Sequence, residues 1–247
     1  MQRGMGGRPM TDQFNDGLDF GQSMALLNEA QSAQNLLRDT VGAIVRLRHP
    51  IVHGDSVFTL GSIGVEKLMK IVLGLVHLRG SGTWPTVKVM KSWGHGVLDM
   101  DALVASTLEA NMAAATHRPY VEKLVKAHQA DQHWPLLSAV FDRYGQSGRF
   151  YYLDHLARGQ PDKWEAPVEF WNRLELCITD GQPNILTMIA GEQGEAERGY
   201  ARLSLVSATS LDKWWFIIHR AAIQGCFGER GKTIGWEIWP HGREVLE

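Results

Sequence analysis

The segment from Ser62 to Leu78 constrains the fold more than any other part of the chain, because it is the most apolar stretch of the sequence. Its apolar residues cover most faces of a helix, as expected of a helix that other helices surround. These residues are Ile63, Leu68, Ile71, Val72, Leu75, Val76 and Leu78. The segment therefore predicts a central buried helix over residues 56–79.

A polar stripe crosses this predicted helix. Glu66, Lys70 and His77 are separated by four and seven residues, so a helix with 3.6 residues per turn places them nearly on one line. On a helix that is otherwise apolar, such a stripe is either an internal ion pair or one wall of a binding site. Glu66 and Lys70 are therefore candidate binding residues, and both interpretations stay open.

Helical periodicity continues along the rest of the chain, whereas alternation typical of β-strands is missing over any useful length. The expected helices are residues 24–47, 56–79, 85–91, 95–115, 121–128, 135–144, 150–157, 164–178, 186–206 and 211–226. We expect Pro50 to interrupt the chain and Asp55 or Ser56 to cap the central helix. Ser210 is expected to cap the last long helix. The pattern predicts an all-α, multi-helix bundle, with residues 233–239 as a short extended segment.

The sequence predicts a short tail followed by one domain. Residues 1–12 have no apolar core and are expected to form a disordered tail, and residues 13–247 to form a single all-helical domain. A subdivision near residues 116–120 is the one internal boundary that the pattern offers, because Pro119 follows a long helical stretch. With 44% hydrophobic and 21% charged residues, the composition is that of a globular protein.

Charge and hydropathy limit the partners and the compartment. A formal charge of −2 gives no general attraction to RNA or to anionic lipid, so such a partner needs a local basic patch. No apolar run approaches 18 residues, and the N-terminus lacks a signal-peptide core, so we expect a cytoplasmic protein without a membrane partner. Cys177 and Cys226 lie within apolar helical patterns and are expected to be reduced core residues.

Several standard catalytic motifs are missing from the sequence. Gly231-Lys232-Thr233 resembles the end of a phosphate-binding loop, but Cys226 occupies the position where that motif requires glycine. His49 and His53, or the group His128, Asp131 and His133, have spacings that could offer metal ligands, and core or solvated histidines are the favoured interpretation. The sequence thus predicts no metal and no cofactor.

Arg48 and His53 lie five residues apart, next to the expected start of the central helix. A histidine with a pKa near neutrality can act as general acid or base on the 2′-hydroxyl or the leaving 5′-oxygen of RNA. Arginine stays charged, and its forked guanidinium can stabilise the pentacoordinate phosphorane. The pair is therefore a candidate catalytic site for metal-independent RNA cleavage, and a structural pair at a helix end is the alternative.

These residues also resemble a known family. Ribonucleases of the HEPN (higher eukaryote and prokaryote nucleotide-binding) superfamily carry an arginine, a polar residue, three to five further residues and then a histidine, a spacing similar to that of Arg48 to His53. Residues 64–70 are similar to the Glu-Lys-rich core helix of the family, and residues 94–98 to the start of its following helix. The resemblance covers about residues 45–110. It implies RNA binding or cleavage by a homodimer, and a toxin or defence effector.

A second candidate surface lies between residues 143 and 155. Arg143 and Arg149 flank a glycine-containing turn that leads to Tyr151 and His155, and such cationic and aromatic side chains hold phosphates and stack on unpaired bases. If Arg149 reaches the central helix, Glu66 is its natural partner. The alternative is a helix connection whose aromatic residues are core.

Two functions therefore stand side by side. One is a HEPN-like protein that binds RNA or cleaves it without a metal. The other is a non-catalytic helical protein-interaction or regulatory module. Nine tryptophans favour self-association in either case, because large aromatic side chains anchor interfaces, and the expected partners are RNA, a protein and a second copy of the chain.

Overall fold

The structure, a computed structural model, describes residues 17–160 and 163–246, and within these ranges every regular element is a helix. The helices are α1 (Phe20–Arg46), α2 (Pro50–Ser81), α3 (Val87–Ser92), α4 (Val97–Asn111), η1 (Met112–Ala114), α5 (Arg118–Gln129), α6 (Trp134–Gln146), η2 (Gly148–Phe150), α7 (Tyr151–Arg158), α8 (Pro167–Gly181), α9 (Pro183–Ile189), α10 (Gln193–Ile223) and α11 (Glu229–Gly235). The predicted all-α fold is confirmed. The expected tail, residues 1–12, lies outside the described residues.

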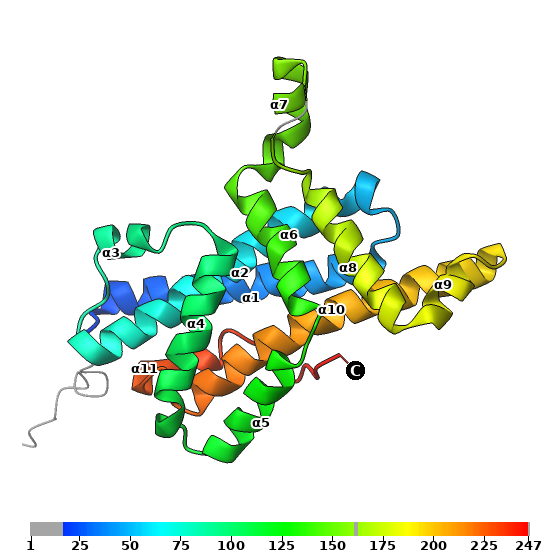
Figure 1. Cartoon of the computed structure of the whole chain (residues 1–247). Helices are drawn as coiled ribbons and strands as arrows, with labels where there is room; N and C mark the ends of the chain where they lie inside the picture. Colours follow the sequence, from blue (N-terminus) through cyan, green and yellow to red (C-terminus); the bar gives the residue numbers. More distant parts are fainter. Residues whose placement is uncertain (1–16, 161–162, 247) are drawn as a thin grey trace, which may run out of the picture.

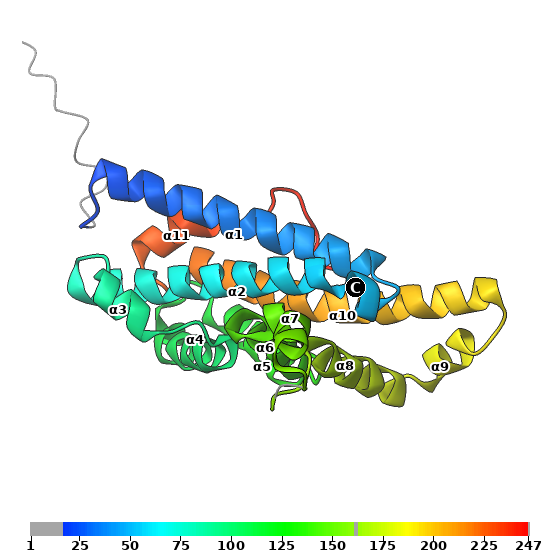
Figure 2. The same cartoon turned by 90° about the horizontal axis from the view of Figure 1, so that it is seen from above.

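Three long helices, α1, α2 and α10, run side by side along the length of the molecule (Figure 2). Helices α4, α6 and α8 pack across α2 on one side, and α1 covers it on another (Figure 1). Leu68 and Met69, near the middle of α2, are completely buried. The central buried helix is therefore confirmed, and it extends beyond the expected residues 56–79 at both ends.

Prolines begin helices in this chain. Pro50 is the first residue of α2, so the prediction that Asp55 or Ser56 caps this helix was wrong, and His49 occupies the cap position instead. The reason is that the N–H groups of the first helical residues have no acceptor within the helix, so proline loses no hydrogen bond there, and its fixed φ suits that position. Pro119 likewise lies in the first turn of α5.

Helix α10 is the second core helix, and its length was mispredicted. The sequence suggested two helices with a cap at Ser210, but one continuous helix runs from Gln193 to Ile223, and Ser210 is buried in its middle. Small polar residues fit this environment because their hydroxyls find partners there. The Ser207 hydroxyl, for example, donates to the Leu203 carbonyl at 3.1 Å.

The expected extended segment over residues 233–239 was also wrong. Helix α11 includes Ile234, and a turn follows in which the Glu237 N–H donates to the Ile234 carbonyl. The apolar residues that suggested alternation are instead spaced as in a helix, because Ile234 and Ile238 lie four residues apart and are both buried. Beyond Trp239 the chain is irregular and folds back on α10.

One contiguous cluster of buried apolar side chains extends from Leu26 to Trp239 and includes residues from both sides of positions 116–120. The division into domains stays a prediction. Among the described residues, no helix combines the length and the apolar character that crossing a membrane requires.

Candidate functional site

Arg48 and His53, the predicted catalytic pair, differ in burial and in hydrogen bonding. Arg48 Nη1 donates hydrogen bonds to the carbonyls of Val45 (2.8 Å) and Leu47 (2.9 Å) and to the Ser204 hydroxyl (3.3 Å). These carbonyls belong to the C-terminal end of α1, where helices need external donors. His53 is exposed in the first turns of α2. The contacts of Arg48 are those of a residue that joins the end of α1 to α10.

The polar stripe on α2 contains an ion pair. Glu66 Oε1 lies 2.7 Å from Lys70 Nζ and 2.8 Å from His95 Nδ1, and the side chains of Glu66 and Lys70 retain only about a fifth of their exposure. Arg149, the partner expected for Glu66, donates to the Gly145 carbonyl instead. The stripe therefore joins α2 to the connection between α3 and α4.

The second candidate surface is divided between the core and solvent. Arg143 is buried, and it donates to the Glu165 carbonyl at 2.7 Å and to the Ser147 hydroxyl at 2.6 Å. Its guanidinium also lies 6.0 Å from the centre of the half-buried Tyr151 ring. Arg149 is exposed and His155 is half-buried. Only Arg143 and Tyr151 of this predicted set are brought together.

Helices η2 and α7 form an arm that projects from the body of the molecule (Figure 1); we call it the α7 arm. No residue of α7 is buried. The large side chains that the arm and the chain just after it expose are Phe150, Tyr152, Leu153, Leu156 and Trp164. The arm thus exposes large apolar and aromatic side chains, whereas of the predicted set only Arg149 is exposed.

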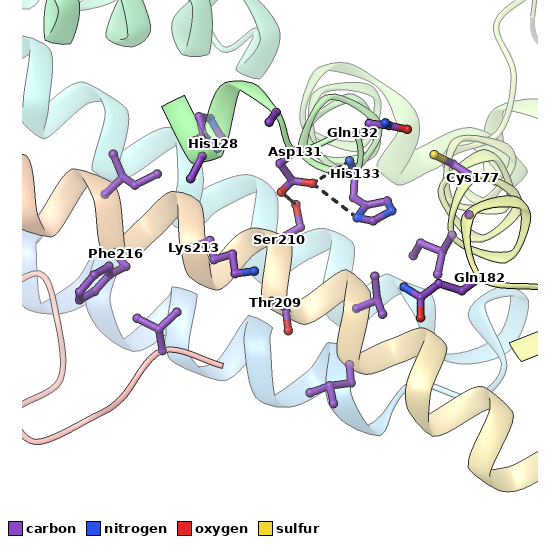
Figure 3. Close-up of a pocket in the computed structure, with 18 of the residues that line it drawn as sticks. His128, Asp131, Gln132, His133, Cys177, Gln182, Thr209, Ser210, Lys213 and Phe216 are labelled. Carbon is purple, nitrogen blue, oxygen red and sulfur yellow. Dashed lines mark hydrogen bonds and ion pairs between the residues drawn. The ribbon is translucent and has the colours of Figure 1, made fainter. Parts of the chain in front are cut away.

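A well-formed hollow of the described structure lies elsewhere. It is a cleft of about 780 Å³ between α5, the α5–α6 turn, the end of α8 and one face of α10, and we call it the α10 cleft (Figure 3). Its volume falls within the range of pockets that hold small molecules. Val245, in the C-terminal segment, also lines the cleft.

A single face of α10 forms the floor of the cleft. The residues that recur on this face at helical spacing are Arg202, Leu205, Thr209, Lys213, Phe216 and Ile217. Separations of three and four residues place side chains on one side of a helix. Because α10 is continuous through residue 210, the face is unbroken for about 22 Å.

Asp131, in the α5–α6 turn, is the centre of a small hydrogen-bond network (Figure 3). Ser210 donates its hydroxyl proton to Asp131 Oδ2 at 2.7 Å, and the His133 backbone N–H donates to Oδ1 at 2.9 Å. The His133 ring nitrogen Nδ1 lies 3.4 Å from the same oxygen. In a serine nucleophile the hydroxyl proton goes to histidine, whereas here it goes to the carboxylate. The network thus fixes the turn to α10 and does not activate Ser210.

His128 lies behind this turn. Burial lowers the pKa of its imidazole below the usual 6.5, and the nearby carboxylates of Asp101 and Asp131 oppose that shift. Its Nδ1 atom is buried and has no hydrogen-bond partner among the described residues. Burial also raises the pKa of Asp101, although the indole N–H groups of Trp134 (2.8 Å) and Trp214 (3.1 Å) donate to it. Lowered basicity favours a neutral His128 at one side of the cleft.

The lining of the cleft carries more cationic than anionic side chains. Arg202 and Lys213 are exposed, and their charged groups form no ion pair or hydrogen bond with any residue that the structure describes. Asp131 is the single carboxylate of the lining, and both of its oxygens already accept hydrogen bonds. Apolar side chains such as Ile178 and Phe216 make up much of the remaining wall.

The two cysteines differ. Cys226 is completely buried, as expected, and burial raises the pKa of its thiol to about 11. Cys177 is only half-buried, and it lines the cleft from α8 (Figure 3). In the part of the chain that the structure describes, no three histidine, cysteine or acidic side chains come together to hold a metal ion.

Comparison with known proteins adds no relative: no family model, no curated protein and no solved structure matches the chain. The function is therefore argued from the geometry. Sequence reasoning noticed His128, Asp131 and His133 together, but it missed the cleft. The signal was the spacing of Arg202, Leu205, Thr209 and Lys213, which the expected break in α10 concealed.

Proposed function

We propose that the chain is a non-catalytic helical regulatory module that binds a small, partly apolar molecule in the α10 cleft. The observation that carries this proposal is the cleft itself, a hollow of about 780 Å³ with many apolar side chains and two cations that have no partner within residues 17–160 and 163–246. A ligand site of this kind typically combines apolar walls with a few polar groups that fix orientation. The bonding of Ser210 to Asp131 supports binding without nucleophilic chemistry.

The test uses the neutral dye Nile red, whose fluorescence rises in an apolar site. Thr209→Trp fills the floor of the cleft, so we expect dye affinity to fall at least tenfold. Ala102→Trp adds the same ring to an exposed position of α4, outside the cleft, and should bind like the wild type.

The α7 arm provides a second check on specificity, because Leu156 is an exposed apolar residue that could also attract the dye. Leu156→Ser should leave the dye affinity unchanged. Equal affinity of the wild type and Thr209→Trp, with both proteins folded by circular dichroism, would reject the cleft as the site.

RNA binding by a HEPN-like homodimer is the second candidate function, and one observation favours it. The α7 arm exposes Phe150 and Tyr152, and Arg149 lies 6.0 Å from the Phe150 ring centre. Lys163 similarly lies 5.1 Å from the ring centre of Trp164. Exposed rings beside cations can stack on unpaired bases and bind phosphates.

Anisotropy of a labelled single-stranded RNA tests this second function. A base stacked on an aromatic side chain contributes about 1–3 kcal/mol, so Tyr152→Ala should weaken binding at least fivefold. Leu176→Ala, at an exposed site on α8, should have no effect. Failure of the wild type to bind would remove RNA as a partner.

The contacts of Arg48 favour RNA binding without cleavage, because its guanidinium is engaged by backbone carbonyls. Labelled RNA incubated in EDTA should remain equally intact with the wild type and with Arg48→Ala/His53→Ala. Cleavage by the wild type alone would assign a catalytic role to these two residues.

A further inference from the structure

We propose that the ligand of the α10 cleft is an organic anion with an elongated apolar body, whose carboxylate binds Lys213. This inference rests on the proposed function and goes further, because it names the ligand class and its orientation. The structural basis is the Lys213 ammonium group, which lies in the cleft beside Thr209 and Ser210 (Figure 3) and has no partner among the residues that the structure describes.

The charge of the lining selects an anion. Arg202 and Lys213 carry two positive charges, against one negative charge on Asp131. Asp131 is already bonded to Ser210 and to the His133 backbone, so it has little capacity to attract a cationic ligand. An ammonium group without a partner gains a charge-assisted hydrogen bond when a carboxylate arrives. The whole chain has a net charge of −2, so this excess of cations is a local feature.

The shape of the cleft selects an elongated ligand. Lys213 and Arg202 are eleven residues apart on the same helix, a separation of about 16 Å along its axis. Leu205 and Val206 lie between them on α10, and Ile178 of α8 is also part of the lining. A carboxylate at Lys213 therefore allows an unbranched apolar chain to lie over these side chains and to pass Cys177.

Lys213 is the better anchor because polar groups surround it. Thr209 and Ser210 precede it on the same helix, and Gln132 belongs to the α5–α6 turn that lines the cleft (Figure 3). The Thr209 hydroxyl can donate to a remaining lone pair of a carboxylate, whereas the Ser210 proton is already donated to Asp131. Arg202 lies about 16 Å away from Lys213 along the axis of α10.

Cys177 provides a built-in reporter for the test. The chain has two cysteines, and Cys226 is buried with a raised thiol pKa, so alkylation at neutral pH is directed to Cys177. The neutral reagent N-ethylmaleimide is followed by mass spectrometry. Decanoate and decan-1-ol, below their micelle-forming concentrations, are the probes because they share the apolar chain and differ in charge.

We expect decanoate to slow alkylation of Cys177 at least fivefold, and decan-1-ol to require at least a tenfold higher concentration for half of that protection. Lys213→Gln should abolish this preference for the carboxylate. Arg202→Gln, on the same face, should reduce the preference less than Lys213→Gln does, because Arg202 contributes positive charge to the cleft without contacting the carboxylate. Both residues are exposed, so neither substitution threatens folding.

The outcomes separate the two proposals. Equal protection by both probes would overturn the anion inference and leave binding in the cleft intact. Protection by neither would overturn the inference and the proposed function together. Loss of the preference in Arg202→Gln, but not in Lys213→Gln, would overturn the placement of the carboxylate.

Discussion

At the scale of single residues, His219 links stability to pH. Its side chain is 5% exposed, its Nδ1–H group donates to the Gly235 carbonyl at 2.8 Å, and its ring stacks on Trp239. Burial lowers its pKa from 6.5 to about 4. Between these two values the unfolded chain binds more protons than the folded chain, so stability present at pH 7 is lost as the pH falls toward 4.

Urea unfolding at pH 7.0 and pH 4.5 measures this effect. The wild type should lose about 2 kcal/mol more than His219→Asn, whose amide can still donate to the Gly235 carbonyl. Three carboxyl groups with raised pKa values shift stability in the opposite direction, but they are common to both proteins: the half-buried Asp101 and Glu175 and the buried Asp212. Equal losses would show that His219 does not titrate in this window.

Arg243 holds the C-terminal segment to α10 by a buried ion pair. It pairs with Asp212, whose side chain is fully buried, and its guanidinium lies 5.1 Å from the Trp215 ring centre and 4.8 Å from that of Trp239. Arg243→Ala leaves a buried carboxylate without its cation, so we expect a loss of about 3–5 kcal/mol in the free energy of unfolding.

The double variant Asp212→Asn/Arg243→Ala provides the control for this prediction. It removes the buried charge, while the asparagine oxygen can still accept the hydrogen bond from the Leu246 N–H. Chemical denaturation should therefore find it more stable than Arg243→Ala alone. If it is less stable, packing on the tryptophans dominates over charge.

At the scale of elements, the glycines of α2 show how closely its neighbours approach. A Cβ on Gly61 would lie 2.1 Å from the Phe141 ring on α6, whereas a Cβ on Gly80 would meet nothing within 4 Å. Gly61→Ala should therefore cost about 1–3 kcal/mol through overpacking. Gly80→Ala should stabilise by about 0.5–1 kcal/mol, because alanine is the better helix former.

Thermal unfolding of the two glycine variants checks this comparison. A lower melting temperature for Gly61→Ala and a higher one for Gly80→Ala are expected. A neutral Gly61→Ala would mean that Phe141 can move away and that the contact between α2 and α6 is loose.

Helical periodicity predicted the elements that bury one clear apolar face, and α2 is the best example. It failed where polar residues are buried with hydrogen-bond partners, as at Ser207, which bonds within α10, and Ser210, which bonds to Asp131 of the α5–α6 turn. The role of Pro50 was mispredicted because proline occurs both at the first position of helices and at the points where helices break. These errors are local, so the fold class was predictable although several ends were not.

The cleft could not be predicted in the same way, because it depends on tertiary packing. Lys213 and Asp131 belong to different elements. They line the same cleft only because α5 and α8 pack against α10. Likewise, the sequence offered Arg149 as the partner of Glu66, and the structure supplies His95 instead. Periodicity indicates which side of a helix is buried, but not which helix covers it.

At the scale of the whole molecule, the cleft and the α7 arm lie in separate regions. Figure 1 shows the arm projecting from one side of the bundle and α5, which borders the cleft, at the opposite side. Substitutions in the arm therefore leave the cleft intact. This separation allows ligand binding and association to be tested independently in one protein.

The final prediction concerns self-association through the α7 arm. An isolated helix of eight residues has little stability in water, and α7 buries none of its residues within one chain. Leu153 and Leu156 are 63% and 77% exposed, so a second copy that covers them would supply the missing packing. We expect sedimentation velocity to show a homodimer of the wild type and a monomer of Leu153→Ser/Leu156→Ser. Leu176→Ser, which changes a 60% exposed leucine of α8, should remain dimeric. A monomeric wild type at micromolar concentrations, or a double variant that still dimerises, would exclude the arm as the interface.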